Sequence, residues 1–500
     1  MRTNGIGERG NGQADAVVVG SGPNGLAAAL VLAGADLRVE VFEAEPTVGG
    51  GTRTAELTLP GFRHDVCSVA HPMALASPFF RAFGLADKVE MLQPEAAFAQ
   101  PLDGRQAAVA WRDLDRTAAT LGPDARAWRA VFAPLVARWP GLVEAALSDQ
   151  RRPPADPLTA LRLLLRVGEF GTPAWSARFR GEPARALLAG VAAHAIRPPC
   201  APGPAGAGLL LAALGHAVGW PVPRGGSQAI ADAMAAELVR RGGLIHTGRR
   251  IDSVSELPST RVLLLDTSPA GLLRIAGRRL PESYARRLRA FRYGAAACKV
   301  DFALSGPVPW RDPACAATGT LHLSGTRAET VAVEREVAAG RHPERPFVLA
   351  VQPGVVDDTR APAGRHTLYT YAHVPHGSTV DVGEAVTAQV ERFAPGFRDL
   401  VLARRTTTAA DLSVYNANYV GGDISAGAMS LRQTVFRPVP AWDPYATPLD
   451  GVFLCSASTP PGPGVHGMAG LHAARRTLRR VFGITGDPLR FVRGDHAPVP

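Results

Sequence analysis

Three glycines near the start of the sequence have the spacing of a turn that binds phosphate groups. Gly20, Gly22 and Gly25 stand between an apolar run, residues 15–20, and a run rich in alanine and leucine, residues 24–35. In such a turn the first glycine permits the sharp bend, the second lets the backbone approach a pyrophosphate, and the third lets a helix pack against a sheet. Amide groups at the N-terminus of that helix attract the phosphate oxygens. We therefore predict a dinucleotide site that includes Gly20, Gly22, Pro23, Asn24 and Gly25.

A carboxylate follows this turn at the distance expected for a ribose contact. Residues 37–43 predict a second strand, and Glu43 ends it, close to the ~20 residues that separate the turn from the ribose-binding acid in dinucleotide folds. The order strand, glycine turn, helix, strand, acid is typical of a nucleotide-binding βαβ unit. The alternative is a βαβ unit that binds no ligand.

A second glycine cluster, Gly49–Gly51, lies just beyond Glu43, with Arg53 beside it. A domain that binds NAD alone does not need this cluster. Here the sequence resembles the flavoprotein superfamily that contains phytoene desaturases and monoamine oxidases. In that superfamily a glycine pair after the second strand and a nearby arginine support the pyrophosphate of FAD. The resemblance therefore implies FAD as the cofactor, with contacts from Glu43, Ala44, Gly50, Gly51, Thr52 and Arg53.

The other end of the chain carries a matching motif. Residues 451–481 predict a strand, a loop rich in proline and glycine, and a helix, and they resemble the C-terminal FAD motif of phytoene desaturase-like enzymes. In that family the helix N-terminus meets the pyrimidine side of the flavin, where amide groups and the helix dipole stabilise negative charge. The residues implied are Gly464, Val465, His466, Gly467 and Met468.

Both motifs must contribute to one site, so the chain must leave and re-enter one domain. We predict an α/β fold with a Rossmann-like FAD-binding domain assembled from discontinuous segments, and a substrate domain with an antiparallel sheet and a helical cap. The FAD-binding segments are residues 15–79, 217–290 and 445–485. The substrate domain consists of residues 80–216 and 291–444, and tails are expected at residues 1–14, which we predict to be disordered, and 486–500.

Segment 219–256 predicts the first return to the FAD-binding domain. The resemblance implies a third strand here and backbone contacts to the adenosine near Ile251; a buried unit without ligand contact is the alternative. Residues 205–220 are nearly all apolar and form either core or the wall of an apolar tunnel. Four strand-like runs within residues 291–440 predict the antiparallel sheet, which should form the floor of the substrate cavity.

Lys299 is the most informative single residue of the substrate domain. The chain has 54 lysines and arginines, of which only Lys88 and Lys299 are lysines, and Lys299 lies in an apolar strand. A compact amine can relay protons there, whereas a guanidinium with its very high pKa cannot. In the resembling amine oxidases, a lysine on a similar strand before a Pro/Trp turn, here residues 307–310, holds a water against flavin N5. The alternative is a lysine whose ammonium group reaches solvent from a sheet edge.

The loop at residues 61–73 follows the second glycine cluster. In the resembling family this loop runs under the flavin, often with an aspartate where Asp65 stands. We therefore expect His64 and His71 near the flavin, as catalytic or as structural histidines, and we take Lys299, His71 and His466 as the catalytic candidates. Covalent attachment through His64, Cys67 or His71 stays open, although non-covalent binding is expected. Further candidates for the cavity lining are His322, Tyr371, His373, Asn416 and Asn418, and Asp301 is expected to pair with a neighbouring cation.

Composition excludes several classes of protein. The net charge is +10, but the arginines are scattered and no nucleic-acid-binding motif is present, so no nucleic-acid partner is expected. The five cysteines form no CxxC pair, which predicts a reducing compartment without a disulfide framework or a metal site. No apolar run has the ~18 residues of a spanning helix, and no signal peptide is found. We expect a cytoplasmic protein, with either a solvated face or peripheral membrane contact at residues 161–170.

The expected function is that of an FAD-dependent oxidoreductase. From Asp15 to Val481 the chain resembles the phytoene desaturase-like branch called pyridine nucleotide-disulfide oxidoreductase domain-containing proteins. Residues 458–467 have prolines and glycines where amine oxidases have aromatic residues. This favours hydride transfer from a largely apolar small molecule, isoprenoid- or acyl-like, of the desaturase or dehydrogenase type. The alternatives are an amine or amino-acid oxidase that uses oxygen, a flavin-dependent isomerase or reductase, and an FAD-stabilised protein that binds an apolar ligand without catalysis. Electron acceptor and oligomeric state stay open.

Overall fold

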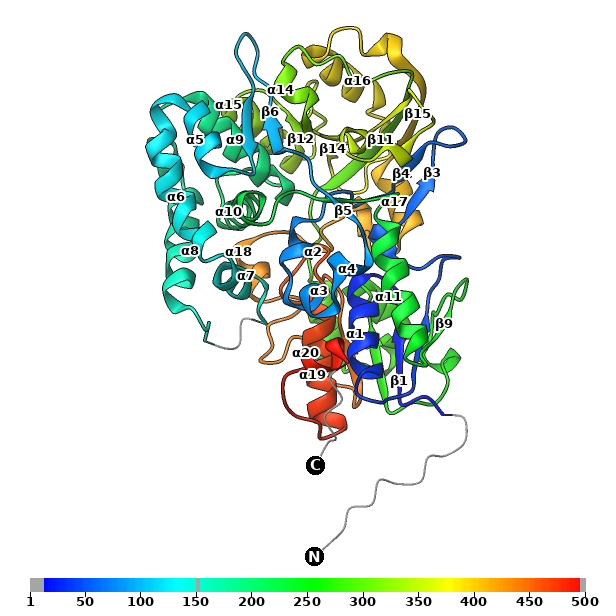
Figure 1. The fold of residues 1–500 in the computed structure, drawn as a ribbon. Helices are drawn as coiled ribbons and strands as arrows, with labels where there is room; N and C mark the ends of the chain where they lie inside the picture. Colours follow the sequence, from blue (N-terminus) through cyan, green and yellow to red (C-terminus); the bar gives the residue numbers. More distant parts are fainter. Residues whose placement is uncertain (1–12, 150–152, 495–500) are drawn as a thin grey trace, which may run out of the picture.

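The computed structural model describes residues 13–149 and 153–494 (Figure 1). The predicted N-terminal tail, residues 1–14, lies outside the described residues except for its last two positions. The predicted C-terminal tail is described as far as residue 494 and contains a short helix, α20 (Leu489–Arg493). Phe491 and Val492 of this helix are buried, and the helix packs beside α1 (Pro23–Ala33).

One sheet consists of five parallel strands from distant parts of the chain, in the order β16-β10-β1-β2-β9. The strands are β1 (Ala16–Val19), β2 (Val39–Phe42), β9 (Leu244–His246), β10 (Val262–Leu265) and β16 (Val452–Leu454). The central strands β1 and β10 are wholly apolar because helices cover both faces of the sheet. This sheet and its helices form the predicted Rossmann-like α/β unit.

The two ends of the chain meet on one face of this sheet. There α1 lies between α11 (Gln228–Arg240) and α19 (Met468–Val481), and Figure 1 shows the red α19 beside the blue α1. A Cβ at Gly470 would overlap the Asn24 carbonyl oxygen, so only glycine permits this close approach of the two helices. The opposite face is covered by α12 (Pro269–Ala276) and α13 (Glu282–Arg289).

The second sheet has seven strands, in the order β15-β11-β14-β13-β12-β6-β7. They are β6 (Ala96–Gln100), β7 (Ala108–Trp111), β11 (Ala296–Leu304), β12 (Thr318–Leu323), β13 (Val348–Val351), β14 (His366–Val374) and β15 (Val401–Thr407). The strands expected within residues 291–440 form its antiparallel part. The sheet is mixed because β6 lies parallel to β12. Segment 80–216 of the predicted substrate domain thus contributes β6 and β7 to the sheet: β6 is rich in alanine, a helix former, and its strand pairing overrides that propensity.

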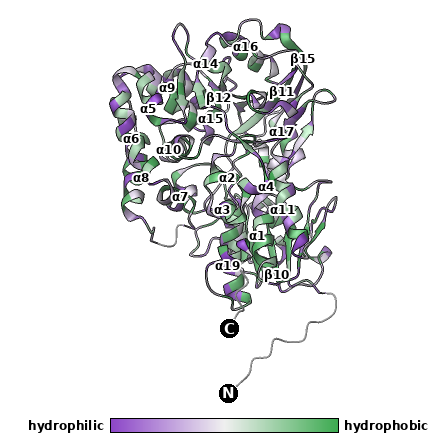
Figure 2. Ribbon diagram, in the orientation of Figure 1, coloured by the Kyte–Doolittle hydropathy of each residue, from purple (hydrophilic) through white to green (hydrophobic). Residues whose placement is uncertain are grey.

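Helices pack beside this sheet and form the predicted cap. They are α5 (Leu114–Thr120), α6 (Ala125–Ala137), α7 (Trp139–Leu147), α8 (Pro157–Phe170), α9 (Glu182–Ala192) and α10 (Pro202–Ala217). The largely buried α10 contacts α6, α7, α8 and α9. Figure 2 shows hydrophobic residues gathered on elements enclosed between layers, such as α1 and β10.

In the described part of the chain, no single helix combines the length and hydropathy needed to cross a bilayer. The helical segments Gly122–Ala137 and Trp139–Leu147 meet those criteria only as a pair, across a bend of 80°.

Candidate functional site

A cavity of about 610 Å³ lies between the two sheets. It begins at the carboxyl ends of β1, β2 and β10, which is where parallel α/β sheets bind ligands, and extends to β12, β13 and β14. The predicted site residues that line it are Gly20, Gly22, Pro23, Asn24, Glu43, Ala44, Gly50, Gly51, Thr52, Arg53, His71, Ile251, Gly464 and Val465. Segments from both ends of the chain and from the middle therefore share one cavity.

The glycine turn at the start of α1 binds the carboxyl group of Asp266. The Asp266 carboxylate, at the end of β10, accepts the Gly25 amide at 2.9 Å and lies 2.7 Å from the point where a Cβ of Gly22 would stand. Burial, together with the nearby Glu43 carboxylate, raises the pKa of Asp266 to about 7. Gly25 lies beneath the cavity rather than on its wall. Amide donors that accommodate a carboxylate in this way have the chemistry required for a phosphate group.

Glu43 joins the two glycine clusters. One oxygen of its buried carboxylate accepts the Ser21 amide at 2.9 Å and Ser21 Oγ at 2.5 Å. The other accepts the Glu45 amide at 2.9 Å and Arg53 Nη2 at 3.1 Å. Because a carboxylate offers about four acceptor positions, these donors occupy Glu43, and its observed role is to fasten the glycine turn to the loop of Arg53. The predicted ribose contact requires one of these donors to give way.

The C-terminal loop reaches the cavity through Gly464 and Val465, whereas His466 lies behind it. His466 Nε2 donates to the Gly462 carbonyl at 3.1 Å, and Nδ1 accepts the Met468 amide at 3.0 Å. Burial lowers the pKa of this imidazole to about 4. Both ring nitrogens are thus used to hold the loop at the start of α19, which corrects the catalytic prediction for His466. Gly467, with φ 66°, and Met468 also lie off the cavity wall.

Lys299 is buried in the interior of the second sheet, since β11 lies between β14 and β15. The sheet-edge alternative is therefore wrong. Its ammonium group donates to Asp301, the neighbouring cation–carboxylate pair that the sequence predicts, and Asp301 also faces His64 Nδ1 at 3.4 Å. The ring of Tyr369, a residue of the cavity wall, lies 4.5 Å from Lys299 Nζ. Lys299 itself does not line the cavity, and its predicted role as a proton relay through a water stays a prediction.

His71 does lie on the cavity wall. Its Nε2 is 2.8 Å from Ser227 Oγ, and that hydroxyl donates to the Ser68 carbonyl at 2.7 Å. The hydrogen of the His71 contact therefore comes from Nε2, which leaves Nδ1 as a bare acceptor without a partner among the described residues. Burial lowers the pKa of His71 to about 4. The nearby Asp65, predicted to lie under the flavin, is instead held by the buried Arg360.

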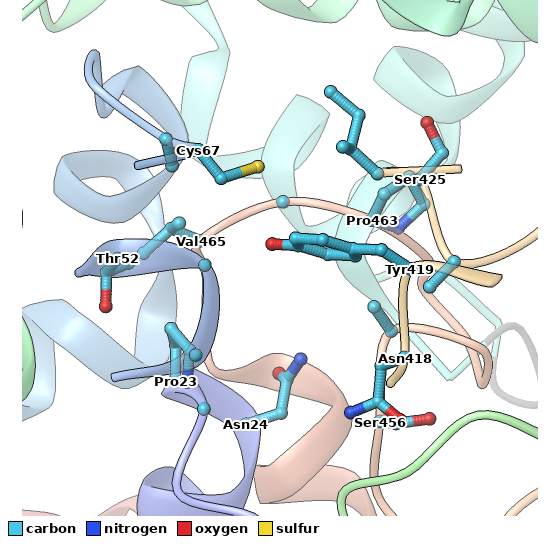
Figure 3. Close-up of a pocket in the computed structure, with 18 of the residues that line it drawn as sticks. Pro23, Asn24, Thr52, Cys67, Asn418, Tyr419, Ser425, Ser456, Pro463 and Val465 are labelled. Carbon is cyan, nitrogen blue, oxygen red and sulfur yellow. The ribbon is translucent and has the colours of Figure 1, made fainter. Parts of the chain in front are cut away.

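The cavity wall also carries residues that the sequence analysis missed or named without a role. The tyrosines are Tyr369, Tyr371, Tyr415 and Tyr419. Of these four tyrosines, only Tyr371 was expected to line the cavity. Asn416 and Asn418 were also expected there, and both line it. Figure 3 shows Tyr419 reaching into the cavity beside Asn418, across from Thr52. His322 and His373 were expected there too, but both are buried behind the wall.

Sequence comparison connects this site with flavoproteins. The profile of the family "Flavin containing amine oxidoreductase" matches residues 24–478. Pyridine nucleotide-disulfide oxidoreductase domain-containing protein 2 of Rattus norvegicus is 28% identical, over 93% of each chain. Phytoene dehydrogenase of Streptomyces griseus is 28% identical, over 77% of each chain.

Solved structures share the fold. A putrescine oxidase variant has a TM-score of 0.61 at 16% identity, covering 94% of this chain and 99% of that one. An oxidoreductase from Methanosarcina mazei has a TM-score of 0.59 at 16% identity, covering 93% and 100% of the two chains. At these identities the likeness concerns the fold alone.

Proposed function

The chain belongs to the flavin-containing amine oxidoreductase family, which makes it an FAD-dependent oxidoreductase, and we propose that it oxidises a largely apolar small molecule in the manner of a desaturase or dehydrogenase. The observation that carries this proposal is the continuity of the cavity. One end has the glycine turns and Arg53, in contact with Tyr415 and Tyr419, and the other has aliphatic side chains.

The residues at the first end fit the polar part of FAD. The α1 turn already accommodates the Asp266 carboxylate, and a Cβ at Gly50 would lie 3.2 Å from Gly22 Cα, so the two glycine clusters are in close contact. Together they offer amide donors to a pyrophosphate. FAD, when bound, supplies the acceptor for a hydride.

The other end of the cavity favours an apolar substrate. Leu163 and Val167 from α8, Leu210 and Leu211 from α10, and Met429 contribute aliphatic surface. Burial of apolar surface contributes about 25 cal/mol per Å², so these walls bind a hydrocarbon chain and exclude water from it. Residues 205–220 thus serve both as core, through the buried Leu209 and Leu214, and as tunnel wall.

Amine oxidation is a second candidate, and the tyrosines favour it. Tyr369, Tyr371 and Tyr419 can present aromatic faces to an ammonium group. The ring of Tyr415 already packs against the Arg53 guanidinium, 5.6 Å from the ring centroid. The lack of aromatic residues in the C-terminal motif was expected to disfavour this reaction. The aromatic side chains come instead from β14 and from the segment before the C-terminal motif.

We include peripheral membrane contact and a cytoplasmic location in the proposal. Helix α8 exposes Leu158, Leu161, Leu164 and Leu165, with exposed fractions of 49–66%. The same helix contributes Leu163 to the cavity wall. A membrane surface at these leucines would bring an apolar substrate to the cavity and would cover side chains that are otherwise in water.

An anaerobic substrate screen tests the proposal. The purified protein is mixed with isoprenoid, acyl-lipid and amine panels, and reduction is followed as bleaching of the flavin band. Bleaching by isoprenoid or acyl compounds supports the desaturase type, whereas bleaching by amines alone, with peroxide formed in air, supports the oxidase. A protein that holds FAD and is bleached by no panel would be a binding protein, and one that holds no FAD would contradict the cofactor assignment.

A further inference from the structure

A row of three polar side chains leads from the second sheet to the cavity wall. It begins at Gln100, the last residue of β6, continues through His322 on β12 and ends at His194, in the turn after α9. We propose that His194 Nδ1 is the proton acceptor of the substrate cavity, and that His322 and Gln100 are positioning residues that hold its tautomer.

The hydrogen bonds of Gln100 show which of its amide atoms is the donor and which is the acceptor. Its amide nitrogen donates to the Gly325 carbonyl oxygen at 2.6 Å and to Ser324 Oγ at 3.0 Å. Because a carbonyl oxygen can only accept a hydrogen bond, the atom beside Gly325 must be the amide nitrogen of Gln100. Oε1 is therefore on the opposite side of the amide, away from Gly325. Gln100 is fully buried, and Oε1 has no hydrogen-bond partner within residues 13–149 and 153–494.

His322 Nδ1 lies near this oxygen without a hydrogen bond to it. The ring is fully buried, and Nδ1 likewise has no partner in the described chain. Both atoms face the same point beside Gly190: a Cβ there would overlap Gln100 Oε1 and would lie 2.9 Å from His322 Nδ1. A lone pair on Nδ1 would be repelled by the oxygen lone pairs, whereas an N–H group is attracted to them. This assigns the hydrogen to Nδ1 and the lone pair to Nε2.

The tautomer of His194 follows from that of His322. Their Nε2 atoms are 2.9 Å apart, so one carries a hydrogen and the other accepts it. Because His322 Nε2 is the acceptor, His194 has its hydrogen on Nε2 and a lone pair on Nδ1. His194 lines the cavity, and its Nδ1 makes no hydrogen bond with any described residue. A lone pair is therefore available to a molecule in the cavity.

Both imidazoles are neutral at neutral pH. Burial lowers the pKa of His194 to about 3 and lowers the pKa of His322 well below 6.5. The titratable groups around the pair are on neighbouring elements. On β14, His373 bonds the buried Glu334 of α15 (Arg327–Ala338), and burial raises the pKa of Tyr371, which keeps this phenol neutral. The electrostatic effect of His373 adds to burial in lowering the pKa of both imidazoles.

This inference rests on the proposed function. Removal of a hydride takes one hydrogen with its electron pair to the bound FAD, and a second hydrogen leaves the substrate as a proton. The new bond is N–H at His194 Nδ1, and the bond that breaks is the C–H, O–H or N–H bond of the substrate. Solvent receives the proton afterwards. The imidazolium formed in between is stabilised because its Nε2–H group donates to His322.

Nitrogen-15 NMR of the histidine rings in the holoenzyme tests the tautomers directly. The variants His194→Phe and His322→Phe identify the two sets of signals by their loss. At pH 7 we expect His194 to be unprotonated at Nδ1 and His322 to be unprotonated at Nε2. Gln100→Leu should remove the preference of His322, and Gln100→Glu should strengthen it. A hydrogen on His194 Nδ1 would overturn the inference, whatever the activity.

A matched ligand pair tests the acceptor in the cavity. Geraniol and geranyl methyl ether differ in one hydroxyl donor, and binding is measured through the absorbance of the holoenzyme's flavin band. We expect geraniol to bind about 3–10-fold more tightly, the effect of one net hydrogen bond, and His194→Phe to lose this preference while retaining affinity for the ether. His216→Gln is the control, since this buried histidine of α10 bonds the Trp111 carbonyl and does not line the cavity.

The outcomes separate the two proposals. If the wild-type protein holds FAD and His194→Phe keeps the preference for geraniol, the inference about His194 fails and the proposed function stands. If the purified protein holds no FAD, the proposed function itself fails.

Discussion

Lys299 and Asp301 form a buried ion pair on the same face of β11, two residues apart, with side chains exposed by 3% and 0%. Two charges removed from water in this way stabilise the fold only while both are present, since loss of one partner leaves the other uncompensated. Lys299 Nζ lies 4.5 Å from the centre of the Tyr369 ring, so loss of the ion pair would change the packing behind this residue of the cavity wall.

Substitution Lys299→Met should therefore destabilise the protein by about 3–5 kcal/mol, measured by urea unfolding. The double variant Lys299→Met/Asp301→Asn should recover most of this loss. The control is Lys88→Met, whose lysine is 40% exposed and 3.9 Å from Glu237, where about 0–1 kcal/mol is expected. If the double variant has normal stability but reduces the flavin more slowly and with an altered pH profile, the result would support the predicted proton relay by Lys299.

Asp266 predicts a pH-dependent affinity for FAD. Its pKa of about 7 means that the carboxyl group beside the glycine turn is largely neutral at pH 6 and charged at pH 8. The charged form repels a pyrophosphate, so the dissociation constant of FAD should increase about tenfold, or ~1.4 kcal/mol, between these pH values. Asp266→Asn should bind FAD with no such increase, and Asp232→Asn, on the exposed part of α11, should behave as the wild type. Equal pH dependence in all three proteins would rule out this function of Asp266.

The contact between Gly51 and Tyr419 can be tested with a compensating pair. A Cβ at Gly51 would overlap the Tyr419 hydroxyl, so Gly51→Ala should lower the FAD content of the purified protein. Adding Tyr419→Phe removes the hydroxyl and should restore much of that content. The single variant Tyr419→Phe serves as the control. Failure of the double variant to improve on Gly51→Ala would show that the alanine acts through something other than this overlap.

The exposed leucines of α8 predict binding to lipid surfaces. Vesicles of phosphatidylcholine and phosphatidylglycerol in equal parts should carry the wild-type protein to the top of a flotation gradient. Leu161→Ser/Leu164→Ser/Leu165→Ser should stay at the bottom, because the apolar surface is lost. Val239→Ser/Leu244→Ser is a matched control with two comparably exposed apolar residues on α11 and β9. Flotation of the triple variant would contradict the membrane contact.

Local motifs made much of the cavity predictable from the sequence. Gly20, Gly22 and Gly50 act through backbone conformation and close approach, which only glycine permits, so their spacing alone reveals them. The pairing of Asp301 with a cation was also predictable, because an isolated charge in an apolar strand requires a partner.

Residues whose contacts depend on strand register could not be predicted in this way. Nothing near Asp266 in the sequence indicates that its carboxylate meets the glycine turn, since that contact exists only because β10 pairs with β1. His466 looks catalytic within its motif, and only the fold shows that both ring nitrogens bond the backbone. His194 lies within the turn after α9, and nothing in the sequence indicates that β12 brings His322 beside it.

The position of β16 and α19 has a consequence for biosynthesis. A ribosome releases these elements after every other strand of the five-stranded sheet, and until then α1 lacks the neighbour that packs at Gly470. Gly464 and Val465 lie between these two elements, so the cavity gains this part of its wall only after the segments of Gly20, Glu43 and Asp266 have been synthesised.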